Sequence, residues 1–442
     1  ASFDTLSWII CCKIPSAADS AVNGCSDDNM VAEVIFYVIV VFLCVDFLIE
    51  RILESLNRSA MSPRLPESLR GIYDEREYSR FQNYKRENDR FGLLSSSFSF
   101  LVTLIFLCAG GFGWYNAWIT GITDSVLWQT LLFMGGLALI SGLIGLPFDW
   151  YATFHIEEKY GFNKTTPKIY LADLIKGMLV SAVVGGVLLA AIVGFYIWIG
   201  DRFWLYAWGL ITVFSVFMSM FYSQLIVPLF NKQTPLENGV LRDKIQAFAL
   251  KAGFKLDNIY VIDGSKRSTK ANAYFTGLGP KKRIVLYDTL IQDLTGDEIV
   301  AVLAHEVGHY KKRHTLQFMA ASVLQTGFIL WLFSLCVNQP ALSEALGGDG
   351  NYFQLGLVAF VLLYSPVGMV LGLFMNMWSR KNEYEADAYA ATQGQGEALV
   401  TGLKKISVKS LSNLTPHPAY EWVYYSHPSL LKRIGAIRQE EI

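Results

Sequence analysis

Long apolar segments recur along this chain, separated by polar stretches of very different length. Seven of them can form a helix that crosses the hydrocarbon core of a bilayer, which takes about 20 residues. They occupy residues 34–49, 93–113, 126–147, 178–200, 203–230, 316–337 and 353–378. The first is the shortest and contains Asp46. The pattern predicts a mainly α membrane protein with seven transmembrane helices.

The basic residues between these segments predict which side of the membrane each loop occupies. Segments 51–90, 231–315 and 379–442 hold nine, fourteen and eight Lys and Arg, whereas 114–125 and 338–352 hold none. Loops rich in Lys and Arg stay cytoplasmic. With seven alternating spans, the N-terminus is expected outside and the C-terminus in the cytoplasm.

Composition agrees with a membrane protein and excludes some other classes. Hydrophobic residues make up 52% of the chain and charged residues 17%. A net charge of −1 gives no reason to expect a nucleic-acid partner. Six cysteines in 442 residues do not form a disulfide scaffold. A local disulfide among Cys11, Cys12 and Cys25 is expected only if the N-terminal end meets an oxidising space.

Two of the polar segments are long enough to fold on the cytoplasmic side. In 231–314, "LRDKIQAFALKAGF" has the spacing of an amphipathic helix. "NIYVID" and "RIVLYD" alternate as strands do, and the loop between them contains a possible edge strand. "GDEIVAVLAHEVGHY" follows as a helix capped by Thr295 or Asp297. Residues 379–442 are expected to be mainly helical.

The first candidate for chemistry is the H-E-x-x-H pattern of residues 305–309. His305 and His309 lie one turn apart on one helix face, so that both imidazoles can reach one ion. Glu306 lies between them, where it can contact a metal-bound water as a general base. The pattern indicates a zinc hydrolase, and a catalytic zinc needs a third protein ligand and an open position.

The segment "SRKNEYEADAYAA", residues 379–391, is the best source of that third ligand. Glu383 and Asp387 are four apart on one face of a predicted helix, so that one can bind zinc while the other orients a histidine. Glu385 is about 200° round the helix from Glu383 and is expected to face elsewhere. The short segment 338–352 makes the last two spans antiparallel, which brings these residues to the same side as His305.

The chain resembles the type I CAAX prenyl protease family, integral membrane zinc endopeptidases of the gluzincin type. The resemblance rests on "GLPFDWYATFHIEEKYGFN", "SKRSTKANAYFTGL", "KKRIVLYDTLI", "LAHEVGHYKKRHT", "SRKNEYEADAYA" and "YYSHPSLLKRI", in family order. It implies seven helices around a water-filled intramembrane chamber, with a cytoplasmic α+β zincin-like metalloprotease domain.

The resemblance also implies roles for single residues. One zinc ion per chain would be bound by His305, His309 and Glu383, with Glu306 as the general base. The remaining implied roles are an oxyanion-stabilising His427, Asp387 and Arg433 behind the ligands, and Asn272 and Tyr274 along an edge strand that binds the peptide by β-augmentation. The family normally has glutamine where this chain has Glu385.

The domains expected on this basis follow the apolar runs. An extracytoplasmic segment, 1–33, precedes the first five helices in 34–230. The metalloprotease domain is divided between 231–314 and 379–442, and residues 315–378 hold the last two helices.

The expected activity is removal of the last three residues after a prenylated cysteine. We expect a monomer in the endoplasmic reticulum membrane of a eukaryote or the inner membrane of a bacterium. Two alternatives stay open: a quality-control protease that acts on unprenylated membrane proteins, and a transporter or scaffold with a structural zinc. A structural zinc would have a fourth protein ligand, and the sequence offers no convincing fourth.

Overall fold

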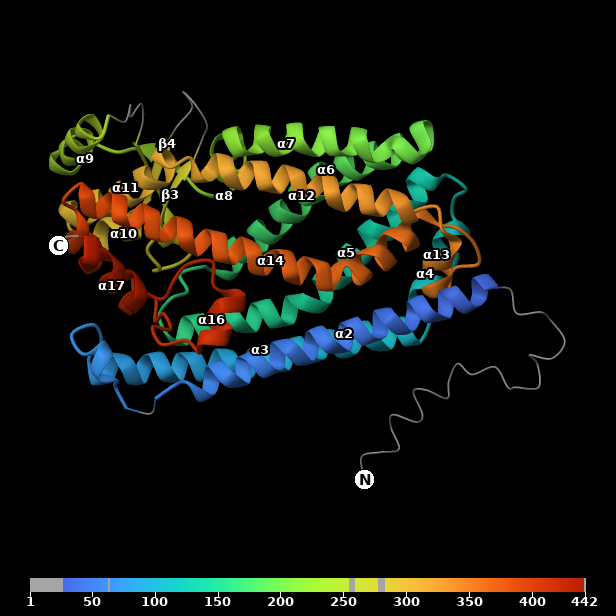
Figure 1. The fold of residues 1–442 in the computed structure, drawn as a ribbon, viewed down its shortest axis with the longest axis horizontal. Helices are drawn as coiled ribbons and strands as arrows, with labels where there is room; N and C mark the ends of the chain where they lie inside the picture. Colours follow the sequence, from blue (N-terminus) through green and yellow to red (C-terminus); the bar gives the residue numbers. More distant parts are fainter. Residues whose placement is uncertain (1–26, 63, 254–258, 277–282, 441–442) are drawn as a thin grey trace.

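The computed structural model describes residues 27–62, 64–253, 259–276 and 283–440. The disulfide considered for Cys11, Cys12 and Cys25 lies outside the described residues. Long helices dominate the molecule (Figure 1), and their bounds are α2 Asp27–Ser59, α3 Glu75–Cys108, α5 Val126–Tyr151, α6 Pro167–Ile199, α7 Phe203–Leu225, α12 His314–Cys336 and α14 Phe353–Thr392.

Among the described residues, six continuous helical stretches are long and apolar enough to cross a membrane. One of them, Pro167–Phe230, is 64 residues long and contains both α6 and α7. Gly200, with φ of 68°, ends α6, and a 3-10 turn at Gly200–Arg202 leads into α7. The predicted fourth and fifth runs are therefore two separate helices, and the mainly helical membrane fold is confirmed.

Two of the predicted runs differ from the observed helices at their ends. The second was expected to reach residue 113, but α3 ends at Cys108. Gly110 adopts the left-handed conformation, with φ of 70°, and a separate helix, α4, occupies Gly111–Thr120. The third continues through Pro147 to Tyr151 and then into a π-helix, Ala152–Glu157. Neighbouring groups can satisfy the backbone that a proline frees within a membrane helix.

The helix α14 joins the membrane region to the predicted metal site. Its 40 residues make it about 60 Å long, twice the thickness of the hydrocarbon core. The sequence predicts separate elements at 353–378 and 379–391, but the two are one uninterrupted helix. A metal ligand on its last turns is thus attached rigidly to a membrane span.

The long helices form a closed ring. In order round the ring, α3, α2, α14, α12, α7, α6 and α5 each pack against the next. The ring closes between α5 and α3 through aromatic side chains: the rings of Phe91 and Tyr151 lie 4.9 Å apart and those of Phe98 and Phe148 5.2 Å apart.

The middle of this ring is hollow. Along α14, every residue from 360 to 381 is described and none of them is buried. In α5, the six consecutive residues 138–143 are all exposed. Six residues turn through more than a full circle of a helix, so exposed side chains face the inside of the ring as well as the outside. The helices therefore enclose solvent-accessible space.

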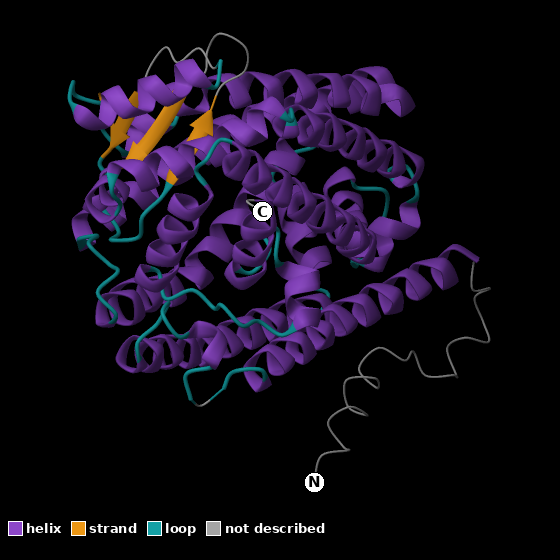
Figure 2. Cartoon of the chain, turned by 60° about the vertical axis from the view of Figure 1, so that its left-hand side comes forward, coloured by secondary structure: helices purple, strands orange, loops and turns teal. Residues whose placement is uncertain are grey.

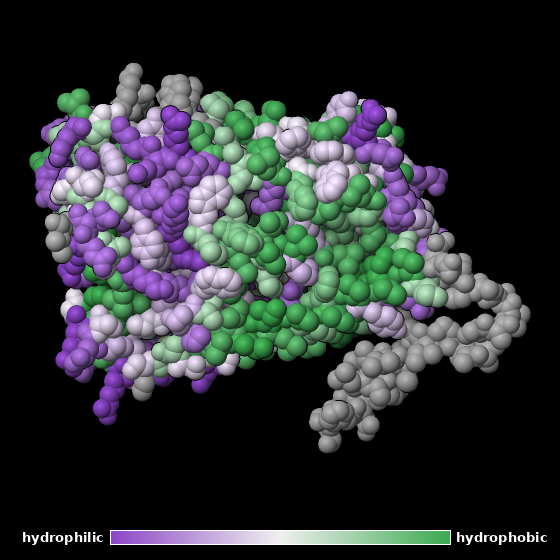
Figure 3. Space-filling view, viewed as in Figure 1, coloured by the Kyte–Doolittle hydropathy of each residue, from purple (hydrophilic) through white to green (hydrophobic). Residues whose placement is uncertain are grey.

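The ring is closed by packed side chains at both of its ends. At the end away from the sheet, α4 and α13 (Pro340–Ala345) pack with α2, α5 and α14 around Phe133 and Leu355. At the other end, a larger core joins α11, α15 and α17 to the sheet and to the beginning of α3. A hydrophobic band lies between two hydrophilic ends (Figure 3), as expected of a protein that spans a bilayer.

The strands of a four-stranded sheet lie together in an otherwise helical molecule (Figure 2), beside α11 (Figure 1). Its order is β1-β2-β4-β3, with strands at Gln233–Pro235, Ile259–Ile262, Ala273–Thr276 and Arg283–Tyr287 for β1 to β4. The two predicted strands, β2 and β4, pair in parallel. β3 pairs antiparallel with β4 and forms one edge of the sheet, and β1, which was not predicted, pairs with β2.

The remaining helices are short and most of them surround the sheet. They are α8 Val227–Phe230, α9 Val240–Lys251, α10 Asp288–Asp293, α11 Gly296–Lys311, α15 Gly396–Lys409, α16 Pro418–Tyr424 and α17 Leu430–Glu440, with 3-10 turns at Glu67–Leu69 and Gly264–Lys266. The amphipathic stretch predicted before the sheet is α9.

Candidate active site

The helix α11, which carries His305 and His309, begins with a capping box. Of the two cap candidates, Thr295 is the cap: its hydroxyl accepts from the backbone N–H of Glu298, and its own N–H donates to the Glu298 carboxylate at 2.8 Å. Lys405 pairs with the same carboxylate at 2.7 Å. These contacts satisfy backbone donors that a helix start otherwise leaves free, and they hold α11 against α15.

A glycine allows α11 to lie directly on α14. A Cβ atom added at Gly308 would lie 3.0 Å from the Cα of Ala386 and 3.1 Å from the Cβ of Tyr389. Only a residue without a side chain fits this contact comfortably. The glycine of H-E-x-G-H is thus the reason that the histidines of α11 reach the carboxylates of α14.

Three ligand atoms converge where the two helices touch. His305 Nε2 lies 3.1 Å from His309 Nε2. Glu383 Oε2 is 3.5 Å from His305 Nε2, and its Oε1 is 3.3 Å from His309 Nε2. One ligand atom from each residue lies within 4.8 Å of the others. Residues 305 and 383, distant in sequence, therefore form one compact group.

The chemistry of this group fits a zinc ion. Glu383 is only 4% exposed, and its Oε2 atom is buried without a hydrogen-bond partner among the described residues. Arg433 Nη1 lies 3.5 Å from this oxygen without a hydrogen bond, and a buried carboxylate oxygen that lacks a donor is costly. Two imidazoles and one carboxylate are the ligands of many catalytic zinc sites. Within the described part of the chain, no fourth His, Cys, Asp or Glu joins the group.

Asp387 and Arg433 lie behind His305. Asp387 Oδ1 is 2.8 Å from His305 Nδ1, so that the carboxylate fixes the ring with Nε2 toward the metal. Arg433 donates to both oxygens of Asp387, at 2.7 and 2.8 Å. Burial disfavours the guanidinium charge, but these bonds to Asp387 keep the pKa of Arg433 above its usual value. The geometry assigns Glu383 to the metal and Asp387 to the histidine, a choice that spacing alone left open.

A second chain of contacts lies behind His309, and the sequence did not predict it. His309 Nδ1 lies 2.9 Å from Nδ1 of the buried His314, whose Nε2 lies 3.3 Å from Glu385 Oε2. With Nε2 toward the metal, His309 carries its proton on Nδ1. This N–H donates a hydrogen bond to Nδ1 of a neutral His314, whose Nε2–H donates one to Glu385. Glu385 faces away from the metal, as expected, but it holds this second histidine.

The general-base candidate, Glu306, faces the edge of the sheet. It lies beside Ala273 and Tyr274 of β3 in a small, mostly apolar space. It forms no hydrogen bond or ion pair with any residue that the structure describes. A carboxylate in this position is free to accept a hydrogen bond from a water molecule or a substrate.

His427 lies beside the ligand group, and Asn272 and Tyr274 lie at the start of the edge strand β3. The side chain of His427 is 63% exposed, and its Nε2 is 3.3 Å from Glu383 Oε1. Asn272 immediately precedes β3 and its carbonyl accepts from the N–H of Tyr287. The Tyr274 hydroxyl lies 3.4 Å from Ser223 Oγ of α7, so its side chain is directed toward the helix ring.

Ion pairs fix the loop before β3 to the membrane helices. Lys270 Nζ is 2.9 Å from Glu157 Oε2 in the π-helix. Arg267 binds both oxygens of Asp173 in α6, at 2.7 and 2.8 Å. Asp173 is thus a paired charge near the start of α6, and β3 is fixed relative to the ring.

A helix ring in the membrane and an open His–His–Glu site at its end define an integral membrane zinc metallopeptidase. Comparison with known protein families agrees. Residues 56–232 match the family model described as CAAX prenyl protease N-terminal, five membrane helices, and residues 235–441 match peptidase family M48. The chain belongs to the CAAX prenyl protease 1 family of M48 metallopeptidases, and its zinc ligands are His305, His309 and Glu383.

Curated relatives and a solved structure are similar over most of the chain. The CAAX prenyl protease 1 homolog of Oryza sativa is 34% identical over 90% of this chain and 96% of its own. CAAX prenyl protease 1 of Saccharomyces cerevisiae is 33% identical over 85% and 88%. The crystal structure of S. mikatae Ste24p superposes with a TM-score of 0.85 at 32% identity, over 91% of this chain and 98% of that one.

Proposed function

We propose that this chain cleaves proteins that end in a prenylated CAAX sequence and removes their last three residues. The names of its relatives, CAAX prenyl protease 1 in yeast and its homologs in rice and human, support this substrate class. The observation that carries the proposal is the position of the zinc ligands beside Glu306 and the edge strand β3, at one end of a hollow ring of membrane helices.

The substrate peptide is bound by the free edge of β3. Its backbone adds as a further strand, in which main-chain hydrogen bonds give affinity without demanding one sequence. Asn272 and Tyr274 flank this edge, and the ion pairs of Arg267 and Lys270 keep it at a fixed distance from the ring. The scissile bond is thereby held next to Glu306.

Proton transfer is the task of Glu306. His305, His309 and Glu383 would hold a zinc ion, which would supply polarisation of the scissile carbonyl and a lowered pKa of a water molecule. Glu306 accepts the proton of the attacking water and returns it to the leaving amine. His427, exposed at the mouth, donates a hydrogen bond to the carbonyl oxygen as its negative charge develops.

Four residues behind the ligand histidines fix the orientation of their rings. Asp387, held by Arg433, fixes the tautomer of His305. His314, held by Glu385, does the same for His309. Because each ligand histidine has its own partner, both present Nε2 to the same point without rearrangement.

The location in the membrane suits a lipidated substrate. Each buried CH2 of a prenyl chain favours apolar surroundings by about 0.8 kcal/mol, while hydrolysis needs water. A ring that is apolar outside and solvent-accessible inside offers apolar surroundings for the prenyl chain and water for hydrolysis in one molecule. We further propose a monomer in the endoplasmic reticulum membrane of a eukaryote or the inner membrane of a bacterium, with the zinc site on the cytoplasmic side and the N-terminus outside.

A paired assay tests this proposal. The purified chain is incubated with a farnesylated CAAX peptide and with the same peptide lacking the lipid, each with and without a zinc chelator. We expect chelator-sensitive release of the C-terminal tripeptide from the farnesylated peptide, and far slower release from the other. Equal cleavage of both peptides would favour the quality-control protease, and cleavage of neither would contradict the proposal.

A further inference from the structure

A cavity of about 970 Å³ lies at the seam where α3 and α5 close the ring. It belongs to the end of the ring that carries the sheet, since Lys159 and Tyr160 in its wall follow the π-helix that binds Lys270. Its wall contains both polar and apolar residues. The ones that matter here are Arg86, Glu87, Arg90, Leu94, Phe148 and Lys159.

Two of its three cations are unpaired. Lys159 binds Glu87 at 2.7 Å. Arg86 and Arg90 are exposed and form no ion pair or hydrogen bond with any described side chain. Glu87 offsets the charge of Lys159, so the cavity keeps two positive charges without a counter-ion. Two guanidinium groups one helical turn apart can bind a phosphate or carboxylate by charge-assisted hydrogen bonds.

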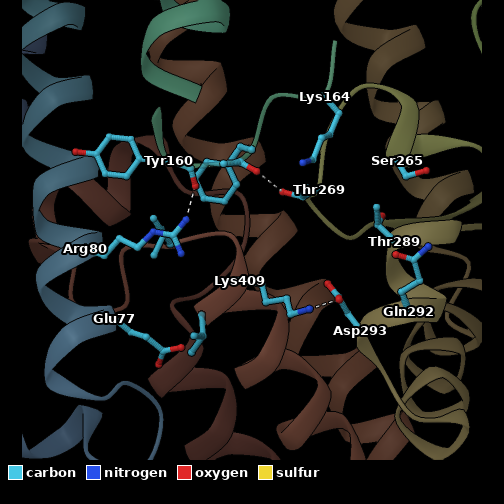
Figure 4. A pocket seen from close by; sticks show the side chains of 14 residues that line it. Glu77, Arg80, Tyr160, Lys164, Ser265, Thr269, Thr289, Gln292, Asp293 and Lys409 are labelled. Carbon is cyan, nitrogen blue, oxygen red and sulfur yellow. Dashed lines mark hydrogen bonds and ion pairs between the residues drawn. The ribbon is translucent and has the colours of Figure 1, made fainter. Parts of the chain in front are cut away.

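A neighbouring cavity of about 500 Å³ shows the contrast. Figure 4 shows Arg80 directed to the backbone carbonyl of Tyr160, and Lys409 directed to Asp293. Glu77 also lines that cavity. Two of its cations thus already have partners, and it offers no comparable pair of free guanidinium groups.

The charged part of the α3–α5 cavity continues into an apolar surface along α3. Leu94 follows Arg90 by one turn, and Leu101 and Ile105 continue the same face of the helix. These three side chains are 62%, 52% and 63% exposed. Large apolar side chains so exposed are unfavourable against water, so this face suits contact with the hydrocarbon of a lipid. The rings of Phe91, Phe148 and Tyr151 seal the seam beneath it.

We propose that this cavity binds the headgroup of an anionic phospholipid. Its phosphodiester lies between Arg86 and Arg90, and its acyl chains follow Leu94, Leu101 and Ile105. A positive site at the water end of an apolar helix face matches a molecule with an anionic head and two apolar tails. The site is separate from the zinc site and from peptide cleavage, and its role is to hold a lipid at the seam of the ring.

Lipid retention tests this proposal directly. The full chain is placed in nanodiscs of phosphatidylcholine with or without a minority of phosphatidylserine, and the lipids that remain bound are identified by native mass spectrometry. The Arg86→Ala, Arg90→Ala double variant is compared with Arg58→Ala, Arg76→Ala. The control removes two exposed arginines of α2 and α3 that lie outside the cavity wall.

We expect wild type and control to retain phosphatidylserine in preference to phosphatidylcholine. In the cavity variant this preference should fall at least about tenfold. Unfolding temperature and peptidase activity in detergent should be unchanged in both variants. Equal retention of the two lipids by wild type, or undiminished phosphatidylserine retention by the cavity variant, would overturn the proposal. So would full displacement by inorganic phosphate alone, which would indicate a site for free phosphate.

Discussion

The middle of α14 and its last turns lie in opposite kinds of surroundings. Its last turns are packed: Glu383, Ala386 and Asp387 are buried against α11 and α17. Its middle, from 360 to 381, has no buried residue at all, although the helix is continuous. The packed end holds ligand atoms that must stay within tenths of an ångström, whereas the open middle borders the solvent-accessible space of the ring. One continuous helix both holds the ligand atoms and borders the space inside the ring, so the geometry of the site is kept next to solvent.

Because of this contrast, breaking the buried ion pair of α14 should cost far more stability than changing its open middle. Asp387→Ala removes two hydrogen bonds of the buried Arg433 and leaves it the ion pair with Glu383 at 3.5 Å. We expect a loss of about 3–5 kcal/mol in the free energy of unfolding. Val367→Ala, in the open middle of α14, should lower the free energy of unfolding by less than about 1 kcal/mol. Denaturant unfolding in detergent measures both, and similar losses in the two variants would remove the contrast.

The contacts behind His309 connect the packed end of α14 to a side chain of α12, His314. His314→Ala removes the acceptor of the His309 Nδ1–H, so we expect zinc affinity to fall about 10–100-fold. Glu385→Gln, which keeps a hydrogen-bond acceptor for His314, should lose less. Competition with a fluorescent zinc chelator gives both affinities. Wild-type affinity in His314→Ala would show that the contact at 2.9 Å has no influence on the metal.

Two glycines offer a matched test of packed and open surroundings. In Gly308→Ala the new Cβ lies 3.0 Å from a backbone atom of α14, whereas in Gly372→Ala it meets nothing within 4 Å. We expect Gly308→Ala to lose about 1–3 kcal/mol of stability. Gly372→Ala should gain up to about 1 kcal/mol, because alanine favours the helix. Thermal unfolding of the two variants should therefore shift in opposite directions.

The smallest effect concerns pH and the cap of α11. Burial raises the pKa of Glu298, but hydrogen bonds from Lys405 and Thr295 outweigh it and hold the pKa below its usual 4.5. A lowered folded-state pKa stabilises the protein above the unfolded pKa, and this stability is lost as the pH falls through the folded value. Glu298→Gln should be less stable than wild type at neutral pH, and the difference should shrink below about pH 4.5. A constant difference from pH 7 to pH 4 would contradict this assignment.

Much of the fold was predictable because apolar runs and helical spacing are local signals. The membrane spans follow from the length of the apolar runs. Spacings of three to four residues predict the H-E-x-x-H helix and the pair Glu383 and Asp387. Strand β1 is only three residues long, and its pairing with β2 depends on a distant segment. The continuity of α14 was hidden because its composition changes from apolar to charged at about residue 379 although the helix does not end.

The role of His314 could not be read from the sequence for a specific reason. On an ideal helix, residue 314 would point about 140° away from His309. The chain instead leaves the helix at Lys312, and Arg313 takes a left-handed φ of 59° before α12 begins. That turn brings His314 back onto His309. The five-part division of the chain and its orientation in the membrane stay predictions.

The central claim is that Glu306 performs the proton transfer for a zinc held by His305, His309 and Glu383. Glu306→Gln keeps the shape of the side chain but removes the base, and Glu306 is not a ligand. Zinc content and turnover of a farnesylated CAAX peptide should be measured on the same preparation. We predict one zinc per chain, as in wild type, with turnover lowered about 10²–10⁴-fold. Undiminished turnover with zinc bound would contradict the account.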